Sequence, residues 1–125
     1  MEIKKRYSKK PKAIIKRPWG QFKLLTKNKK STTKLLEVKS GQELSLQKHK
    51  KRKEIWYFIN PGKVQINEDV FNVKAGELIE IPKKTSHRII APKNKNKKSV
   101  QVLEISLGSF NEKDEIRIED KYGRK

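Results

Sequence analysis

The spacing of apolar segments constrains this chain most. Short segments rich in β-branched and aromatic residues recur about every 8 to 12 residues, and turn-forming Gly, Pro, Asn and Asp separate them. The segments are 22–25, 35–38, 44–47, 55–59, 64–66, 70–73, 78–81, 88–90 and 100–105. No window before residue 110 has a helical period. The pattern predicts an all-β protein, a sandwich or barrel of the jelly-roll kind.

The two ends of the chain differ from this pattern. We expect residues 1–16 to form a basic arm, either flexible or paired as an edge strand, and residues 17–125 to form one domain. Residues 111–122 carry mixed charges and predict a short helical or irregular tail. No internal repeat or second domain is visible.

Positive charge is the dominant feature of the composition. The 33 Lys and Arg residues outnumber the 14 acids, giving a net charge of +19, and residues 1–36 contain 13 of these cations and one acid. Such patches attract polyanions, so a basic nucleic-acid-binding β-domain is one alternative. The excess of 27 Lys over 6 Arg favours a solvated surface, and no helix-turn-helix, RNP or KH motif is present. Nucleic acid is therefore the less favoured partner.

Several classes of protein are excluded by what the composition lacks. No apolar run approaches the roughly 18 residues of a membrane span, and residues 1–10 have charge without the apolar stretch of a signal peptide. The absence of Cys excludes disulfides, thiol nucleophiles and Cys-type zinc sites. We expect a soluble cytoplasmic protein.

The two histidines, His49 and His87, indicate a metal site. Residues two apart in a strand share a face, so Gln47 and His49 point the same way. Glu54 opens the next predicted strand after a turn, and His87 begins a later strand. Two imidazoles, an amide oxygen and a carboxylate suit a divalent transition metal: zinc first, with manganese, cobalt, nickel or iron as alternatives. The competing interpretation is that both histidines are structural.

The frame around these residues resembles the two-motif signature of the cupin superfamily. The residues that carry the resemblance stand in the family's order: Gly41, Gln47, His49, Glu54, Gly76, Pro82 and His87. Three positions depart from the general pattern. Gln47 replaces the first His, Lys84 stands where the second motif usually has Gly, and Ala91 stands where it often has Asn.

More extended motifs resemble the cupin domain of type II mannose-6-phosphate isomerases, over residues 17–124. These motifs are Arg17-Pro18-Trp19-Gly20, the segments 44–49 and 52–56, Ile81-Pro82, His87-Arg88, Glu104, Gly108 and the closing segment from Arg117 to Arg124. The chain departs from the family between Gly108 and Arg117, where it is about one residue shorter. In that family the domain often follows a mannose-1-phosphate guanylyltransferase domain, which this sequence lacks, so the resemblance implies a stand-alone isomerase.

The resemblance implies a metal-dependent aldose–ketose isomerase. Its substrate is a sugar phosphate, and mannose 6-phosphate and fructose 6-phosphate interconvert through an enediol. The implied metal ligands are Gln47, His49, Glu54 and His87, where a cation stabilises the developing enediolate. Because a fold does not fix a substrate, the alternative is a cupin metal enzyme or sugar-phosphate-binding protein with a different ligand.

Residue patterns leave the general base open. The candidates are Glu104, Glu43 and a metal-bound hydroxide. Glu43 shares a strand face with Gln47 and His49 but lies far enough along to reach the mouth of the barrel, where it is also a substrate-binding candidate. Glu104 is favoured if its strand points it inward. A solvated strand position is the alternative for either Glu.

Three arginines are candidates for binding phosphate or sugar oxygens: Arg52, Arg88 and Arg117. Arg52 lies in the turn between two predicted ligands, so it is also a catalytic candidate. Strand alternation points Arg88 away from the side to which His87 points, unless the strand is bulged there. Surface ion pairing with nearby acids is the equal alternative for Arg117.

The aromatic residues predict packing. Trp56 and Phe58 share parity with Glu54 and are expected inside the fold, beneath the metal. Trp19 is expected to anchor the N-terminal strand or to line a dimer interface. Because cupins often pair through exchanged or added edge strands, we expect a homodimer.

Overall fold

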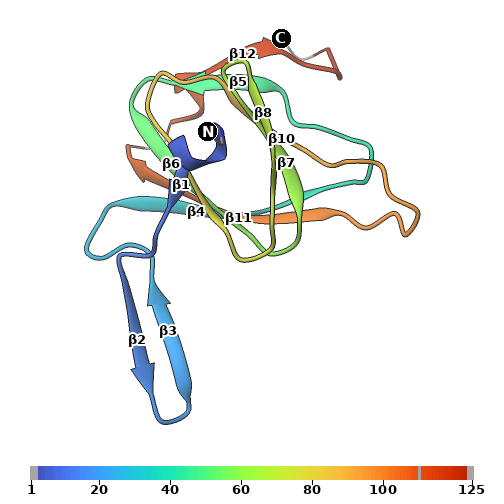
Figure 1. Ribbon diagram of the computed structural model, residues 1–125. Helices are drawn as coiled ribbons and strands as arrows, with labels where there is room; N and C mark the ends of the chain where they lie inside the picture. Colours follow the sequence, from blue (N-terminus) through green and yellow to red (C-terminus); the bar gives the residue numbers. More distant parts are fainter. Residues whose placement is uncertain (1–2, 110, 124–125) are drawn as a thin grey trace.

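Two antiparallel sheets form the body of the protein, as seen in a computed structural model that describes residues 3–109 and 111–123 (Figure 1). The first two residues of the predicted arm, and Arg124 of the closing motif, lie outside these ranges. The first sheet has the order β1 (Ser8–Lys9), β9 (Leu78–Ile81), β6 (Arg52–Phe58), β11 (Val100–Gly108) and β4 (Ser31–Val38). The second has the order β12 (Glu115–Glu119), β5 (Leu46–His49), β10 (His87–Ile90), β7 (Gly62–Ile66) and β8 (Asp69–Val73).

The core lies between the sheets, because strand alternation sends one set of side chains from each sheet inward. On β6 that set includes Trp56 and Phe58, which are fully buried in the main apolar cluster with residues of both sheets, such as Ile89 of β10 and Val102 of β11. The outer face of β6 is also covered, since Ile55 packs in a second cluster. The central strands β6 and β11 are therefore held on both faces, and they supply a firm base for functional side chains.

The predicted all-β fold is confirmed. Each of the predicted apolar segments overlaps a strand. Within the expected basic arm, β1 pairs at the edge of the first sheet, in agreement with the edge-strand alternative. The sequence pattern missed β2 (Ala13–Arg17) as a separate strand, because lysines break up the apolar pattern. It also missed η1 (Ile3–Arg6), a single 3-10 turn too short to show a helical period.

The C-terminal segment differs from the expected helical or irregular tail. It contains the 3-10 turn η2 (Glu112–Asp114) and then β12, which pairs antiparallel with the edge of β5. The alternation of Ile116 and Ile118 is too short to predict a strand, and the backbone groups of β5 provide the reason for strand pairing.

A β-hairpin projects from the body (Figure 1). It is formed by β2 and β3 (Gly20–Leu24), which pair only with each other in the described chain. Arg17 stacks on the ring of Phe22, with 5.5 Å between the guanidinium carbon and the ring centroid. Among the described residues, no helix is long and apolar enough to cross a membrane.

Candidate functional site

Three strands from both sheets bring the two histidines and Glu54 together. His49 ends β5, His87 begins β10, and these neighbouring strands pair in the second sheet with Gln47 opposite His87. Glu54 lies on β6 in the first sheet, after a tight turn from β5. The site therefore forms where the sheets converge, and the chain must fold completely to assemble it.

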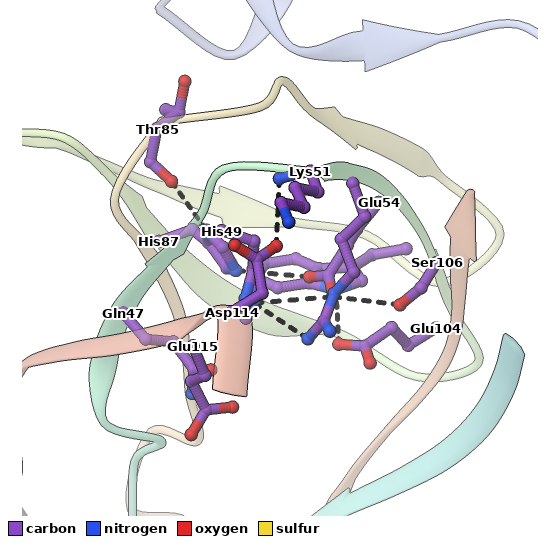
Figure 2. A network of polar contacts seen from close by, with 12 residues as sticks. Gln47, His49, Lys51, Glu54, Thr85, His87, Glu104, Ser106, Asp114 and Glu115 are labelled. Carbon is purple, nitrogen blue, oxygen red and sulfur yellow. Dashed lines mark hydrogen bonds and ion pairs between the residues drawn. The ribbon is translucent and has the colours of Figure 1, made fainter. Parts of the chain in front are cut away.

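The donor atoms of the three side chains face one another (Figure 2). His87 Nε2 lies 3.2 Å from Glu54 Oε1, and His49 Nε2 lies 3.7 Å from Glu54 Oε2. One ligand atom from each residue lies within 4.8 Å of the others, and all three residues are buried. This separation leaves room for an ion that is shared by the three groups.

Hydrogen bonds orient the ligand atoms. The carbonyl oxygen of Thr85 accepts a hydrogen bond from His87 Nδ1 at 2.8 Å, so this nitrogen carries a proton and Nε2 is the nitrogen that faces the other donors. A backbone partner of this kind is typical of metal-binding histidines. Ser106 donates to Glu54 Oε2 at 3.1 Å and fixes the carboxylate.

The protonation states also fit a metal ion. Burial lowers the pKa of His49 to about 4, so its ring is neutral at pH 7. Burial alone would raise the pKa of Glu54, but His87, His49 and Arg52 outweigh it and lower this pKa to about 2. Glu54 Oε1 is buried and has no hydrogen-bond partner among the residues that the structure describes. Two imidazole nitrogens and an ionised, partly unsatisfied carboxylate are a suitable donor set for a divalent transition metal.

Gln47 lines the same cavity as the three donors. Its amide nitrogen donates to Ser45 Oγ at 2.9 Å. This bond fixes the amide by its nitrogen, and the oxygen remains available as an acceptor or ligand.

Arg52 brings a positive charge into the cluster. Its side chain is 3% exposed, and Nη2 donates to His49 Nε2 over 3.2 Å. Its Nε lies 3.4 Å from Glu54 Oε2. A metal ion would take the same His49 lone pair, so Arg52 and a bound cation compete for it.

Glu104 is a second buried carboxylate in the same cavity, reached from β11. Trp56 Nε1 donates to its Oε2 at 3.2 Å. Burial and the charge of Glu54 raise the pKa of Glu104 to about 7, although the Trp56 hydrogen bond and Lys34 oppose this. Glu54 and Glu104 thus have pKa values pushed apart by their surroundings, an arrangement common at sites of proton transfer.

The raised pKa of Glu104 predicts a pH-dependent stability in the metal-free protein. Because the folded pKa is raised, this group's contribution to stability is fully present below its unfolded pKa and is lost as pH rises through about 7. We expect the unfolding free energy of wild type, relative to Glu104→Gln, to fall by about 2 kcal/mol between pH 5 and pH 8. Urea unfolding of the chelated proteins measures this difference. An unchanged difference would contradict the raised pKa.

The cavity has a volume of about 100 Å³. Its lining combines the four proposed ligands with two further carboxylates, two cations and one leucine. The lining residues are Lys34, Leu36, Gln47, His49, Arg52, Glu54, His87, Glu104 and Glu115.

Three residues proposed from sequence do not line this cavity. Arg88 Nη1 forms an ion pair with Glu43 Oε2 at 2.6 Å, and its Nε donates to Gln65. Glu43 also bridges to Ile90 through the backbone. Arg117 Nη2 lies 2.8 Å from Glu115 Oε2.

Sequence reasoning missed other residues around the site. Lys34 lines the cavity because it is opposite Glu104 in the ladder between β4 and β11, a register that local sequence does not reveal. Asp114 accepts hydrogen bonds from the backbone N–H groups of Lys50 and Lys51, at 3.2 and 2.9 Å. The C-terminal segment thereby holds the turn between His49 and Glu54.

Facing antiparallel sheets with a buried His–Glu–His cluster define a protein of the cupin class. The chain belongs to the family described as mannose-6-phosphate isomerase C-terminal, whose model matches residues 4–120. It is 33% identical over 112 residues to the mannose-1-phosphate guanylyltransferase ManC of Salmonella typhimurium, covering 88% of this chain and 23% of that protein. The chain thus spans about a quarter of the length of this relative.

Solved structures share the fold. A cupin protein from Bacteroides fragilis superimposes with a TM-score of 0.57 and 17% identity, covering 63% of this chain and 66% of the other. A putative sugar phosphate isomerase from Acidithiobacillus ferrooxidans gives a TM-score of 0.53 with 18% identity, over 63% of this chain and 51% of the other. At these identities the likeness establishes the cupin fold alone.

Proposed function

We propose that this protein is a metal-dependent aldose–ketose isomerase that interconverts mannose 6-phosphate and fructose 6-phosphate. The observation that carries the proposal is one cavity that combines a buried donor cluster of His49, Glu54 and His87 with a second carboxylate, Glu104. Membership of the isomerase-related family supplies the substrate class. The reaction needs a base to move a proton between neighbouring carbons and a cation to stabilise the enediol, and this cavity offers groups for both.

Glu104 is our candidate for the general base. With a pKa of about 7, it is partly ionised at neutral pH and can accept the C2 proton of the aldose, then return it to C1. Trp56 holds its carboxylate through the indole N–H. Glu54 is ionised more readily but lies among the imidazoles, so we assign it to the metal.

Gln47, His49, Glu54 and His87 would hold the metal, for which zinc is our first expectation. When bound, the ion would polarise substrate oxygens as a Lewis acid. Arg52 would then lose its acceptor on His49, and its guanidinium would be available to a sugar oxygen or to the developing negative charge. We therefore propose Arg52 as a catalytic and substrate-binding residue.

A coupled assay that follows conversion of mannose 6-phosphate to fructose 6-phosphate tests the proposed function. The full chain is assayed after chelation and after addition of zinc, manganese, cobalt, nickel or iron. We expect turnover in at least one metal form and loss of turnover in His49→Ala. A wild-type protein that binds metal without turnover would favour the other interpretation, a cupin with a different ligand.

We also propose that the protein is a homodimer that pairs through the β2–β3 hairpin. Isolated hairpins are marginally stable in water, yet this one exposes Ile14, Trp19 and Phe22 by 53%, 71% and 40%. A groove of about 470 Å³ between the hairpin and the outer face of the first sheet includes Ile14, Tyr57 and Leu103 in its lining. A second copy of the chain would cover these apolar surfaces.

The double variant Trp19→Ser with Phe22→Ser tests the dimer. We expect it to weaken self-association at least about tenfold, because it removes two large apolar contacts from the interface. Sedimentation velocity over a range of concentrations measures the effect, and Lys16→Ser on the same hairpin is the control. A monomeric wild type, or a variant that dimerises like wild type, would contradict this interface.

A further inference from the structure

The size of the cavity limits how a sugar phosphate can enter it. Its volume of about 100 Å³ is well below the roughly 300 to 1,000 Å³ of pockets that enclose drug-sized ligands, so it does not enclose a whole hexose phosphate. In the proposed reaction C1 and C2 must reach the base and the metal donors. The phosphate is attached to C6, at the opposite end of the sugar, so it must remain at the cavity mouth.

The interior of the cavity is taken up by the reacting end of the sugar. Glu54, Glu104 and Glu115 line it together with Arg52 and Lys34, and C1 and C2 must lie between the metal donors and Glu104. Arg52 is nearly fully buried and its guanidinium lies against His49 and Glu54. A group that recognises the phosphate therefore has to be cationic and accessible from solvent.

Lys34 meets both conditions. It lines the cavity from β4, an edge strand of the first sheet, and it is exposed. Its register partner across the ladder is Glu104. Side chains directly opposite in an antiparallel pair lie on the same face about 5 Å apart, so Lys34 lies beside the proposed base, on the side of the cavity that is open to solvent.

We propose that Lys34 binds the phosphate group of the substrate at the mouth of the cavity. The ammonium group would anchor C6 while C1 and C2 lie beside Glu104, and it would favour phosphorylated over unphosphorylated sugars. This inference rests on the proposed function for the choice of substrate. The competing role for Lys34 is purely local, as a charge that tunes Glu104.

Calorimetric titration of mannose 6-phosphate into the metal-loaded full chain tests the proposal. The proteins compared are wild type, Lys34→Met, Lys34→Arg and the exposed-lysine control Lys95→Met. We expect Lys34→Met to weaken binding roughly tenfold or more, since a charge-assisted hydrogen bond is lost, and Lys34→Arg and Lys95→Met to bind within about threefold of wild type. In the isomerase assay, Lys34→Met should raise KM with little change in kcat.

Two results would overturn the role of Lys34. One is equal binding by Lys34→Met and wild type. The other is a fall in kcat at unchanged KM with a shifted acid limb of the pH profile, which would make Lys34 a positioning residue for Glu104. If wild type binds mannose 6-phosphate in a Lys34-dependent way but shows no turnover, the isomerase proposal is contradicted and the role of Lys34 in binding is not. No binding by wild type would overturn both.

Discussion

Replacing Glu54 by Gln is expected to remove metal binding and isomerase activity together. The amide keeps the shape of the side chain and an oxygen that can accept from Ser106, but it loses the negative charge that balances a dication. The metal affinity should fall more than about 100-fold, beyond the effect of losing an outer-shell partner. The unfolding free energy should fall by about 3 to 5 kcal/mol, because Arg52 would remain buried without its carboxylate.

Metal content after dialysis, together with urea unfolding, measures both effects. Glu68→Gln, at an exposed position in the turn between β7 and β8, is the matched control and should behave like wild type. If Glu54→Gln is destabilised too far to fold, His87→Ala tests the ligand set without removing the partner of Arg52. Stoichiometric metal in either folded variant would contradict the assignment of these residues as ligands.

Glu104→Gln should abolish most of the turnover and leave the metal in place. General bases contribute about 10²- to 10⁴-fold to rates, so kcat should fall within that range. In wild type the base must be ionised, so kcat should decline as pH falls through the pKa of Glu104. Burial raises this pKa to about 7 in the metal-free site, and a bound dication would move the decline to lower pH. The amide of Gln does not titrate in this range, so the pH profile of the residual activity of Glu104→Gln should lack the decline at low pH.

The matched variant Glu43→Gln distinguishes Glu104 from Glu43, the two carboxylates that the sequence offers as the general base. Glu43 forms an ion pair with Arg88 and does not line the cavity, so its kcat should remain within about threefold of wild type, as for a partly exposed ion pair. A large loss in Glu43→Gln with a normal rate in Glu104→Gln would reverse the assignment of the base.

Strand alternation predicts the inward residues of the site well. Residues two apart on one strand point to the same face. This rule is enough to place Gln47 with His49 and Glu54 with Trp56. Burial of Trp56 and Phe58 in the core follows from the same rule. The orientation of Arg88 away from the cavity also agrees with alternation, and its ion pair with Glu43 explains where its charge is satisfied.

The remaining features depend on contacts between distant segments. Lys34 meets Glu104 only through the register of β4 and β11, which no local pattern encodes. Asp114 holds the turn at Lys50 and Lys51 across 63 or more residues of sequence. Strand β12 forms because the edge of β5 is open to pairing. Its own apolar alternation is too short to predict a strand.

Isomerisation by the full chain before and after removal of its metal tests the central proposal most directly. Mannose 6-phosphate is incubated with metal-loaded protein, with chelated protein and with chelated protein to which the metal is restored, and fructose 6-phosphate is measured by NMR. The proposal predicts product with the first and third preparations and none with the second. No product from any metal form, or equal product from the chelated protein, would contradict a metal-dependent isomerase.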